Sequence, residues 1–539
     1  MQREKRGVLH LCLAAAAGLA GCAITPPPPP PLPPVAVRVL AINDFHGHLQ
    51  PPRGGFRQPD PADPAKMLSE PAGGAAHLAS AVRAATAGQA NHVFVAAGDL
   101  IGASQLVSAL AKDEPTIAVL DAMGLALSAV GNHEFDRGAA ELLRLQGLAR
   151  FQYLAASTVD VASGKTLLPA YAVRHFEGVP VAFIGLTLKD TPSIVVPSGV
   201  AGLRFDDEAQ TINALVPTLQ AQGVQAIVVL IHEGGFPARG PNDCPALSGP
   251  IVGIVERLHP AVDVVISGHT HRAYNCRLFG KLVTSADQFG TVLSQIDLQL
   301  DRRTGDVLDA RAHNVVVSPQ RFAADPKLAA MVADYAERVR PLAQRVVGRL
   351  PAALPRDAAP SGEMPAGRLI ADAQLAATRG AGAQIALMNP GGVRAALTPQ
   401  PDGSLRYEDL FSVQPFYNNL VTLTLNGAEL QQLLERQWAG QPAPRVLQVS
   451  TGFSYAWDAA QPAGRRVVPG SLRLNGQPIA PDQPLRVTVN SFLAGGGDNF
   501  GAFAAGRERT TGVMDIDALE AFVQGGAVSD AAPRIQRLN

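Results

Sequence analysis

Short apolar runs that stop at polar clusters recur between residues 35 and 319. Five of them, rich in Val, Ile, Leu and Ala, cover residues 35–42, 93–97, 128–130, 226–231 and 262–267. Continuous apolar runs of this length are typical of strands buried on both faces. Intervening segments such as 115–127 and 206–222 have helical length and spacing. The alternation predicts a layered α/β fold with a site along the edge where the strands end.

The residues at these strand ends are suited to metal chemistry. They are, in chain order, Asp44, His46, Asp99, Asn132, His133, Asp136, His232, His269 and His271. One such cluster alone is often an ordinary turn, but five in order favour a shared site. Imidazole and carboxylate ligands without thiolate select divalent Zn, Mn, Co or Fe, and a carboxylate can bridge two ions about 3.5–4 Å apart. The pattern predicts a two-metal hydrolase.

In this order the motifs D-x-H, GD, GNHE, a strand-end His and GHTH resemble the calcineurin-like metallophosphatase superfamily. The resemblance implies one metal held by Asp44, His46 and His271, another held by Asn132, His232 and His269, and Asp99 bridging them. His133 would contact the phosphate and the leaving-group oxygen, and Asp136 would orient its imidazole. His48 is interpreted as a loop side chain, with a place in the site as the alternative.

A helix is predicted after Pro319. Its apolar positions lie three or four residues apart, at Leu328, Met331, Val332, Tyr335 and Val339. We interpret residues 320–345 as a linker helix between two domains. A surface helix of either domain is the alternative.

Three glycine- or proline-marked clusters stand out in the second half, at residues 389–394, 411–419 and 490–499. Each alone is typical of a turn. Together they offer aromatic rings for stacking on a base, an amide, a carboxylate and an arginine for phosphate. The side chains concerned are Asn389, Arg394, Phe416, Asn418, Phe492 and Asp498.

These clusters resemble the C-terminal domain of the secreted 5'-nucleotidase family. The resemblance extends from about Val35 to the C-terminus. It implies a four-layer αββα metallophosphatase sandwich joined by the linker helix to an α+β substrate-binding domain. Phe416 and Phe492 would enclose the base, Asn418 and Asp498 would bind the nucleoside, and Arg394 the phosphate. Family members often carry further arginines where this chain has Pro360–Pro365, so Arg368 or, as second choice, Arg356 would substitute.

The N-terminus has the composition of an export signal. A basic start is followed by an apolar stretch over residues 8–20, and Leu19-Ala20-Gly21-Cys22 resembles the lipobox of bacterial lipoproteins. The resemblance implies cleavage before Cys22, acylation of its thiol and a polyproline spacer. Ala23 then favours the outer membrane of a Gram-negative-type cell envelope, facing the periplasm. An ordinary signal peptide is the alternative.

Cysteine usage and charge limit the partners. Cys244 and Cys276 are the cysteines left in the exported chain, and one disulfide between them is expected; a zinc site is disfavoured because neither lies in a C-x-x-C pair.

With 45 basic and 46 acidic residues, a nucleic-acid partner is not expected. Past the N-terminus no apolar run reaches about 20 residues, so membrane contact would be through the lipid alone. The oligomeric state is left open.

The predicted organisation is a signal peptide at 1–21, an anchor and spacer at 22–35, a metallophosphatase domain at 36–319, the linker helix at 320–345 and a substrate-binding domain at 346–539. The expected activity is hydrolysis of nucleotide phosphate esters, releasing nucleoside and phosphate. The same site could serve a UDP-sugar hydrolase, a 2',3'-cyclic-nucleotide phosphodiesterase or a 3'-nucleotidase. A sulfur thiohydrolase and a non-catalytic nucleoside-binding lipoprotein are further alternatives.

Overall fold

The computed structural model describes residues 32–60, 62–63, 66–441, 443–526 and 532–539. Residues 34–539 form one compact unit. The predicted signal peptide, Cys22 and most of the proline spacer lie outside the described residues. Within the described ranges, no helix combines the length and the apolar character needed to cross a membrane.

The N-terminal half contains two six-stranded sheets. In the first, with strand order β16-β15-β1-β4-β5-β6, four strands run parallel: β1 (Val35–Ile42), β4 (His92–Ala96), β5 (Leu125–Ala129) and β6 (Gln152–Leu154). The antiparallel strands β15 (Val292–Leu300) and β16 (Val307–Val316) complete it. In the second, with order β13-β14-β12-β11-β9-β8, the parallel strands are β9 (Val179–Thr187), β11 (Ala226–His232), β12 (Val264–Ser267) and β14 (Lys281–Ala286). The antiparallel edge strands are β8 (Tyr171–Phe176) and β13 (Ala273–Leu278).

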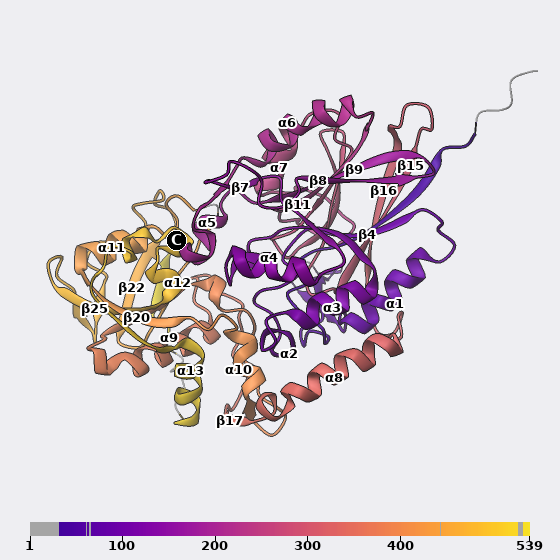
Figure 1. Cartoon of the computed structure of the whole chain (residues 1–539). Helices are drawn as coiled ribbons and strands as arrows, with labels where there is room; N and C mark the ends of the chain where they lie inside the picture. Colours follow the sequence, from indigo (N-terminus) through magenta and orange to yellow (C-terminus); the bar gives the residue numbers. More distant parts are fainter. Residues whose placement is uncertain (1–31, 61, 64–65, 442, 527–531) are drawn as a thin grey trace, which may run out of the picture. The chain divides into compact units, whose positions relative to one another are not determined.

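The two sheets pack face to face and helices cover their outer faces (Figure 1). On β1, Val37 and Val39 enter the core between the sheets, whereas Leu40 and Ile42 face the helix layer. From Val39 to Ile42 both faces of the strand are therefore buried, which explains the uninterrupted apolar residues there. The first sheet is covered by α1 (Ala75–Thr86), α3 (Glu114–Met123) and α4 (Ala139–Leu148), and the second by α6 (Glu208–Ala221) and α7 (Pro250–Glu256). The predicted αββα layering is confirmed.

A helix does form within residues 320–345. It is α8 (Pro326–Ala343), and the Asp325 side chain caps it by accepting the Leu328 N–H at 3.0 Å. Leu328 and Val332 belong to the core beneath the first sheet, whereas Ala343 belongs to a core cluster made mostly of residues beyond 345. The helix thus contributes to both cores.

The C-terminal half is of the α+β type. Its five-stranded sheet, with order β21-β18-β25-β20-β26, contains β18 (Ile385–Met388), β20 (Asn419–Asn426), β21 (Gln448–Val449), β25 (Pro484–Asn490) and β26 (Arg507–Met514). A four-stranded sheet contains β22 (Phe453–Asp458), β23 (Arg473–Leu474), β24 (Gln477–Pro478) and β27 (Ile535–Leu538). The helices here are α9 (Pro365–Thr378), α10 (Tyr407–Val413), α11 (Gly427–Glu435), α12 (Ser491–Ala494) and α13 (Asp515–Gln524).

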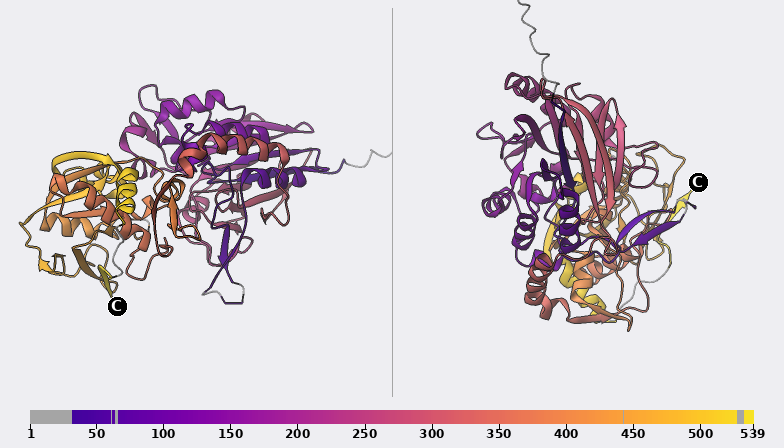
Figure 2. Two further views of the ribbon diagram at one scale, coloured as in Figure 1. Left: turned by 90° about the horizontal axis from the view of Figure 1, so that it is seen from below. Right: turned by 90° about the vertical axis from the view of Figure 1, so that its right-hand side faces the viewer.

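Shorter elements connect these sheets. Three two-stranded pairs are β2 (Phe56–Pro59) with β3 (Met67–Glu70), β7 (Thr158–Asp160) with β10 (Leu203–Phe205), and β17 (Val346–Arg349) with β19 (Ser404–Arg406). The β2–β3 hairpin stands apart from the large sheets (Figure 2). Two short helices are α2 (Leu106–Ala109) and α5 (Thr191–Ile194). The structure pairs Cys244 with Cys276, whose Cα atoms are 5.2 Å apart, and this disulfide ties the segment after β11 to β13.

Candidate active site

The predicted metal ligands come together at the carboxyl ends of the parallel strands. Asp44 and His46 follow β1, Asp99 follows β4, and Asn132 and His133 follow β5. From the second sheet, His232 ends β11, while His269 and His271 follow β12. Five of these residues adopt left-handed backbone conformations, namely Asp44 (φ 50°), His46 (47°), Asp99 (51°), His269 (69°) and His271 (54°). Such conformations cost about 1–3 kcal/mol each and persist only where the surrounding structure holds them.

One group of ligand atoms forms around Asp44. Its Oδ1 lies 3.1 Å from His271 Nε2 and 3.9 Å from His46 Nε2. The His46 and His271 Nε2 atoms are themselves 3.2 Å apart. These three side chains can present their ligand atoms to one ion.

A second group forms around Asp99. Its Oδ2 lies 2.9 Å from His232 Nε2 and 3.7 Å from His46 Nε2, and His269 completes the group. Burial opposes ionisation of Asp99, yet His232 and His133 hold the pKa of this carboxyl well below its usual value. Asp99 therefore faces both groups as a carboxylate.

The donor set fits divalent cations. Asn132 Oδ1 is buried beside these groups and has no hydrogen-bond partner within the described part of the chain. Backbone carbonyls fix the Nδ1 atoms of two histidines. His46 Nδ1 lies 2.8 Å from the Gly102 carbonyl, and His232 Nδ1 lies 2.8 Å from the Ala97 carbonyl. Such contacts aim the Nε2 atoms at a metal. Nitrogen and oxygen donors without sulfur suit Zn, Mn, Co and Fe.

His133 lies beside these groups and pairs with Asp136. Its Nδ1 is 2.8 Å from Asp136 Oδ2, and its backbone N–H donates to Asp99 Oδ1 at 2.9 Å. Burial alone would lower the pKa of His133, but the carboxylates of Asp136 and Asp99 raise it above the ordinary value. The predicted His–Asp pair is thus assembled.

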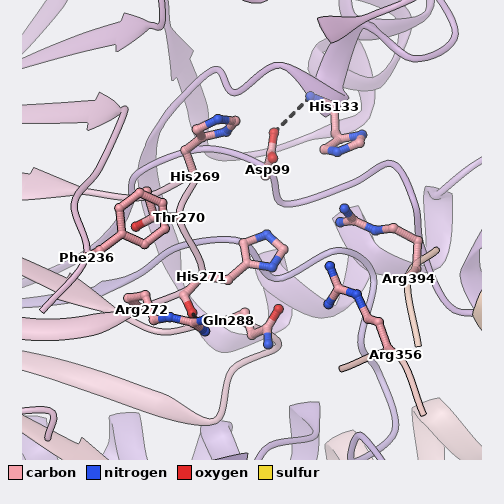
Figure 3. A pocket seen from close by; sticks show the side chains of 10 residues that line it. All are labelled: Asp99, His133, Phe236, His269, Thr270, His271, Arg272, Gln288, Arg356 and Arg394. Atoms are coloured by element: carbon pink, nitrogen blue, oxygen red, sulfur yellow. Dashed lines mark hydrogen bonds between the residues drawn. The ribbon is translucent and has the colours of Figure 1, made fainter. Parts of the chain in front are cut away.

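A cavity of about 270 Å³ opens onto these residues (Figure 3). It is lined by Asp99, His133, His269, His271 and Arg394, all expected from sequence at the site. The other lining residues are Phe236, Thr270, Arg272, Gln288 and Arg356. In Figure 3, Arg394 and Arg356 lie on the side of His133, while Phe236 lies on the opposite side next to Thr270.

Arg356 lines the cavity beside Arg394, whereas Arg368, the first choice from sequence, does not. Arg368 lies in α9, and its guanidinium donates to the Ala532 carbonyl at 3.0 Å. Its helical position directs it toward the C-terminal segment. Arg356 lies in the loop before α9, where no periodic pattern marks an inward-facing side chain.

Two of the predicted substrate-binding residues, Asn389 and Asp498, are linked by a hydrogen bond in the C-terminal half, whereas Asn418 accepts a hydrogen bond from Ser491. Asn389 Nδ2 donates to Asp498 Oδ2 at 2.9 Å, and Asn490 Nδ2 donates to Asn389 Oδ1 at 3.0 Å. Arg445, which the sequence did not single out, forms an ion pair with Asp498.

The two predicted stacking residues have different surroundings. The Phe416 ring stacks on the His133 ring and lies under the Arg394 guanidinium, 5.7 Å from its Cζ. Phe492 is half-buried against the C-terminal core. Among the described residues no ring contact joins the two, so their enclosing a base stays a prediction. His48 stacks on Phe289 with ring centroids 3.6 Å apart, and it does not line the cavity.

Two family models match the chain. Residues 37–273 match the calcineurin-like phosphoesterase family, and residues 346–505 match the 5'-nucleotidase C-terminal domain. The first range contains every predicted metal ligand, and the second contains all three clusters of the C-terminal half.

Two known bacterial proteins are similar to most of the chain. Endonuclease YhcR of Bacillus subtilis is 30% identical over 504 residues, covering 91% of this chain and 40% of its own length. Cell wall protein Lmo0130 of Listeria monocytogenes is 30% identical over 521 residues, covering 87% of this chain and 64% of its own length. The chain thus spans less than two thirds of these curated relatives.

A solved structure agrees with these matches. The 5'-nucleotidase precursor of Thermus thermophilus is 29% identical, with a TM-score of 0.78, and the match covers 94% of this chain and 99% of that one. The two family models together match most of the chain, which joins a calcineurin-like phosphoesterase domain to a 5'-nucleotidase C-terminal domain.

Proposed function

We propose that the protein hydrolyses nucleotide phosphate esters at two divalent cations, releasing nucleoside and phosphate. The observation that carries the proposal is the position of Asp99. Its Oδ2 lies within 4 Å of a histidine nitrogen from each ligand group, 2.9 Å from His232 and 3.7 Å from His46. The same carboxylate lines the cavity that Arg394 reaches.

The ligands divide between two ions. Asp44, His46 and His271 would hold one ion, and Asn132, His232 and His269 the other, with Asp99 shared. When bound, two such cations supply Lewis-acid activation of a water and neutralise charge on the phosphoryl oxygens. The chain contributes the alignment, because the unusual backbone at Asp44 and Asp99 turns both carboxylates toward the histidines.

His133 would transfer a proton to the leaving oxygen. Asp136 engages Nδ1, which leaves Nε2 as the ring atom free to donate. The carboxylates that raise the pKa of His133 keep the imidazolium form populated nearer neutral pH. As the phosphate ester bond breaks, the departing ribose oxygen takes this proton.

The substrate would be held from the C-terminal half. Arg394 and Arg356, which line the cavity on the side of His133, would bind the phosphate. Phe416 and Phe492 would contact the base, and Asn418, Asn389 and Asp498 would bind the nucleoside. Guanidinium groups suit this role because they bind phosphate through paired hydrogen bonds.

A second activity on the same site is favoured by a specific observation. Phe236, Arg272 and Gln288 also line the cavity, on the side of His271 away from His133. A substrate with a second substituent on phosphorus would reach them, as in a UDP-sugar or a 2',3'-cyclic nucleotide. The name endonuclease, carried by one relative, also denotes cleavage of phosphate diesters.

We further propose that the protein acts in the cell envelope, anchored through Cys22. The disulfide between Cys244 and Cys276 supports an oxidising compartment. One relative is named a cell wall protein.

The proposal is tested by phosphate release from purified protein with added Mn²⁺ or Zn²⁺. The substrates are 5'-AMP, 3'-AMP, 2',3'-cyclic AMP, UDP-glucose and bis-p-nitrophenyl phosphate. Because the first cleavage of the last three releases no inorganic phosphate, their nucleotide products are followed by chromatography and nitrophenol by absorbance. Turnover of 5'-AMP that a chelator abolishes and Mn²⁺ restores is the expected result. No turnover of any nucleotide by folded, metal-loaded protein would overturn the proposal.

A further inference from the structure

The carboxylate of Glu134 lies where two loops of the site meet. Glu134 follows His133 in a short helical turn after β5, and its residue is only 2% exposed. Its Oε2 accepts the backbone N–H of Asp99 at 2.9 Å and that of Gly131 at 2.6 Å. Its Oε1 accepts the N–H of Leu100 at 2.8 Å. One side chain thus binds the main chain of the loop after β4 and of the loop after β5.

The reverse contact is also present. Asp99, in the loop after β4, accepts the His133 N–H of the loop after β5 through Oδ1. Each loop therefore supplies an acidic side chain that binds the other loop's main chain. The loops approach so closely that a Cβ on Gly131 would overlap the Asp99 carboxylate.

Glu134 does not reach the substrate side of the site. It is not one of the residues lining the cavity, and it belongs to none of the candidate ligand groups found in the described residues. Its effect on chemistry must therefore pass through Asp99, whose left-handed backbone it holds from behind, and through Asn132, which follows Gly131.

We propose that Glu134 is a positioning residue that fixes Asp99 relative to Asn132 and thereby sets the affinity of the site for its cations. The inference rests on the cation-binding part of the proposed function. Gln cannot reproduce this arrangement. Its amide has one oxygen acceptor, and its NH₂ group would face the backbone N–H donors of one of the two loops. Asp retains both acceptors but is one methylene shorter, so it cannot span both loops.

The test compares Glu134→Gln and Glu134→Asp with Glu435→Gln. Glu435 is a matched control: its carboxylate also accepts two backbone N–H groups, from Arg466 at 2.9 Å and Val467 at 2.7 Å, but in the C-terminal half. Mn²⁺ affinity is measured by competition with a chelating dye, and unfolding midpoints are measured without metal. Loss of such a supporting contact typically weakens metal binding about 10- to 100-fold. We expect a loss of this size for both Glu134 variants and none for the control.

Recovery of activity at high Mn²⁺ concentration distinguishes a loss of positioning from a general loss of structure. For the Glu134 variants, the Mn²⁺ concentration giving half-maximal turnover of p-nitrophenyl phosphate should rise, while KM at saturating Mn²⁺ stays within about twofold of the parent. The proposal is overturned if either Glu134 variant binds Mn²⁺ as tightly as the parent, or if Glu435→Gln is weakened equally. Because Mn²⁺ binding is read directly, a parent protein that binds Mn²⁺ but hydrolyses no nucleotide would contradict the proposed function alone.

Discussion

The ring of His133 stacks on the ring of Phe416, with centroids 5.8 Å apart and planes inclined by 17°. Phe416 belongs to the C-terminal half, and His133 follows a strand of the first sheet. The histidine proposed to protonate the leaving group therefore touches a residue proposed to contact the base. In the proposed reaction the leaving group is the nucleoside. The contact therefore places the proposed proton donor next to the residue proposed to bind the base of that leaving group.

Replacement of His133 tests its assignment as a proton donor rather than a ligand. His133→Ala should lower kcat by about 10²- to 10⁴-fold, the usual contribution of general acid–base catalysis, with metal content kept. Metal analysis and steady-state kinetics on the same samples measure both. His133 also lies in a candidate ligand group with His46 and Asp99, so loss of metal together with activity would show it to be a ligand.

The shared carboxylate should behave differently. Asp99→Ala is expected to lose metal and activity together, because the Asp99 carboxylate lies 2.9 Å from His232 of one ligand group and 3.7 Å from His46 of the other. If this variant kept both properties, the bridging role would be wrong. Asp136→Asn is the comparison: it should keep metal and lower kcat, since its carboxylate contacts only the far ring nitrogen of His133.

Two arginines of neighbouring sequence give a matched test of the cavity. Arg356→Ala should raise KM for 5'-AMP about tenfold or more, because it removes a cation that lines the cavity. Arg368→Ala should change KM less than about twofold, since that side chain points to the Ala532 carbonyl. Equal effects of the two substitutions on KM would contradict this assignment.

Phe416 should contribute to nucleotide binding but not to the phosphoryl chemistry. Stacking on a base contributes about 1–3 kcal/mol to binding. Phe416→Leu should therefore raise KM for 5'-AMP by the fold-change that corresponds to this loss of binding free energy. Glycerol phosphate, which has no ring, should show little change in KM with the same variant. A similar rise in KM for both substrates would place Phe416 against the phosphate instead.

Buried Asp515 should make the fold less stable as pH rises. Burial raises the pKa of Asp515 to about 7, above the usual value near 4 of an unfolded chain. The folded state therefore keeps this proton at pH values where the unfolded state has lost it. The resulting stabilisation is complete below about pH 4 and is lost as pH rises to about 7.

The measurement is urea unfolding of the parent and Asp515→Asn at pH 5 and pH 8. Relative to the variant, the parent should lose stability, of the order of a few kcal/mol, between these two pH values. Parallel changes in the two proteins would show that Asp515 is not protonated in the folded state at pH 5.

From sequence the strand-end residues and the arginines Arg394 and Arg356 of the cavity could be named, but its other lining residues could not. Asp44, Asp99 and His232 could be found because each ends an apolar run, and strand ends of parallel sheets meet at one edge. Phe236 and Gln288 carry no such signal. They lie in irregular segments, and only the folding of those segments around His271 brings them to the cavity.

The C-terminal half shows the same limit. Asn389 and Asp498 were recognisable from glycine-marked motifs, and they do bind each other. Arg445, which neutralises Asp498, follows α11 in a segment without a motif, and its pairing depends on long-range packing. Arg368 and Arg356 both flank Pro360–Pro365, and only the fold distinguishes which of them lines the cavity.

The most direct test of the central claim is a crystal structure of the Mn²⁺-loaded protein with anomalous diffraction from the metal. The account predicts two anomalous peaks about 3.5–4 Å apart, with Asp99 contacting both. One peak should also contact Asp44, His46 and His271, and the other Asn132, His232 and His269. A single peak, or two peaks that do not share Asp99, would contradict the account.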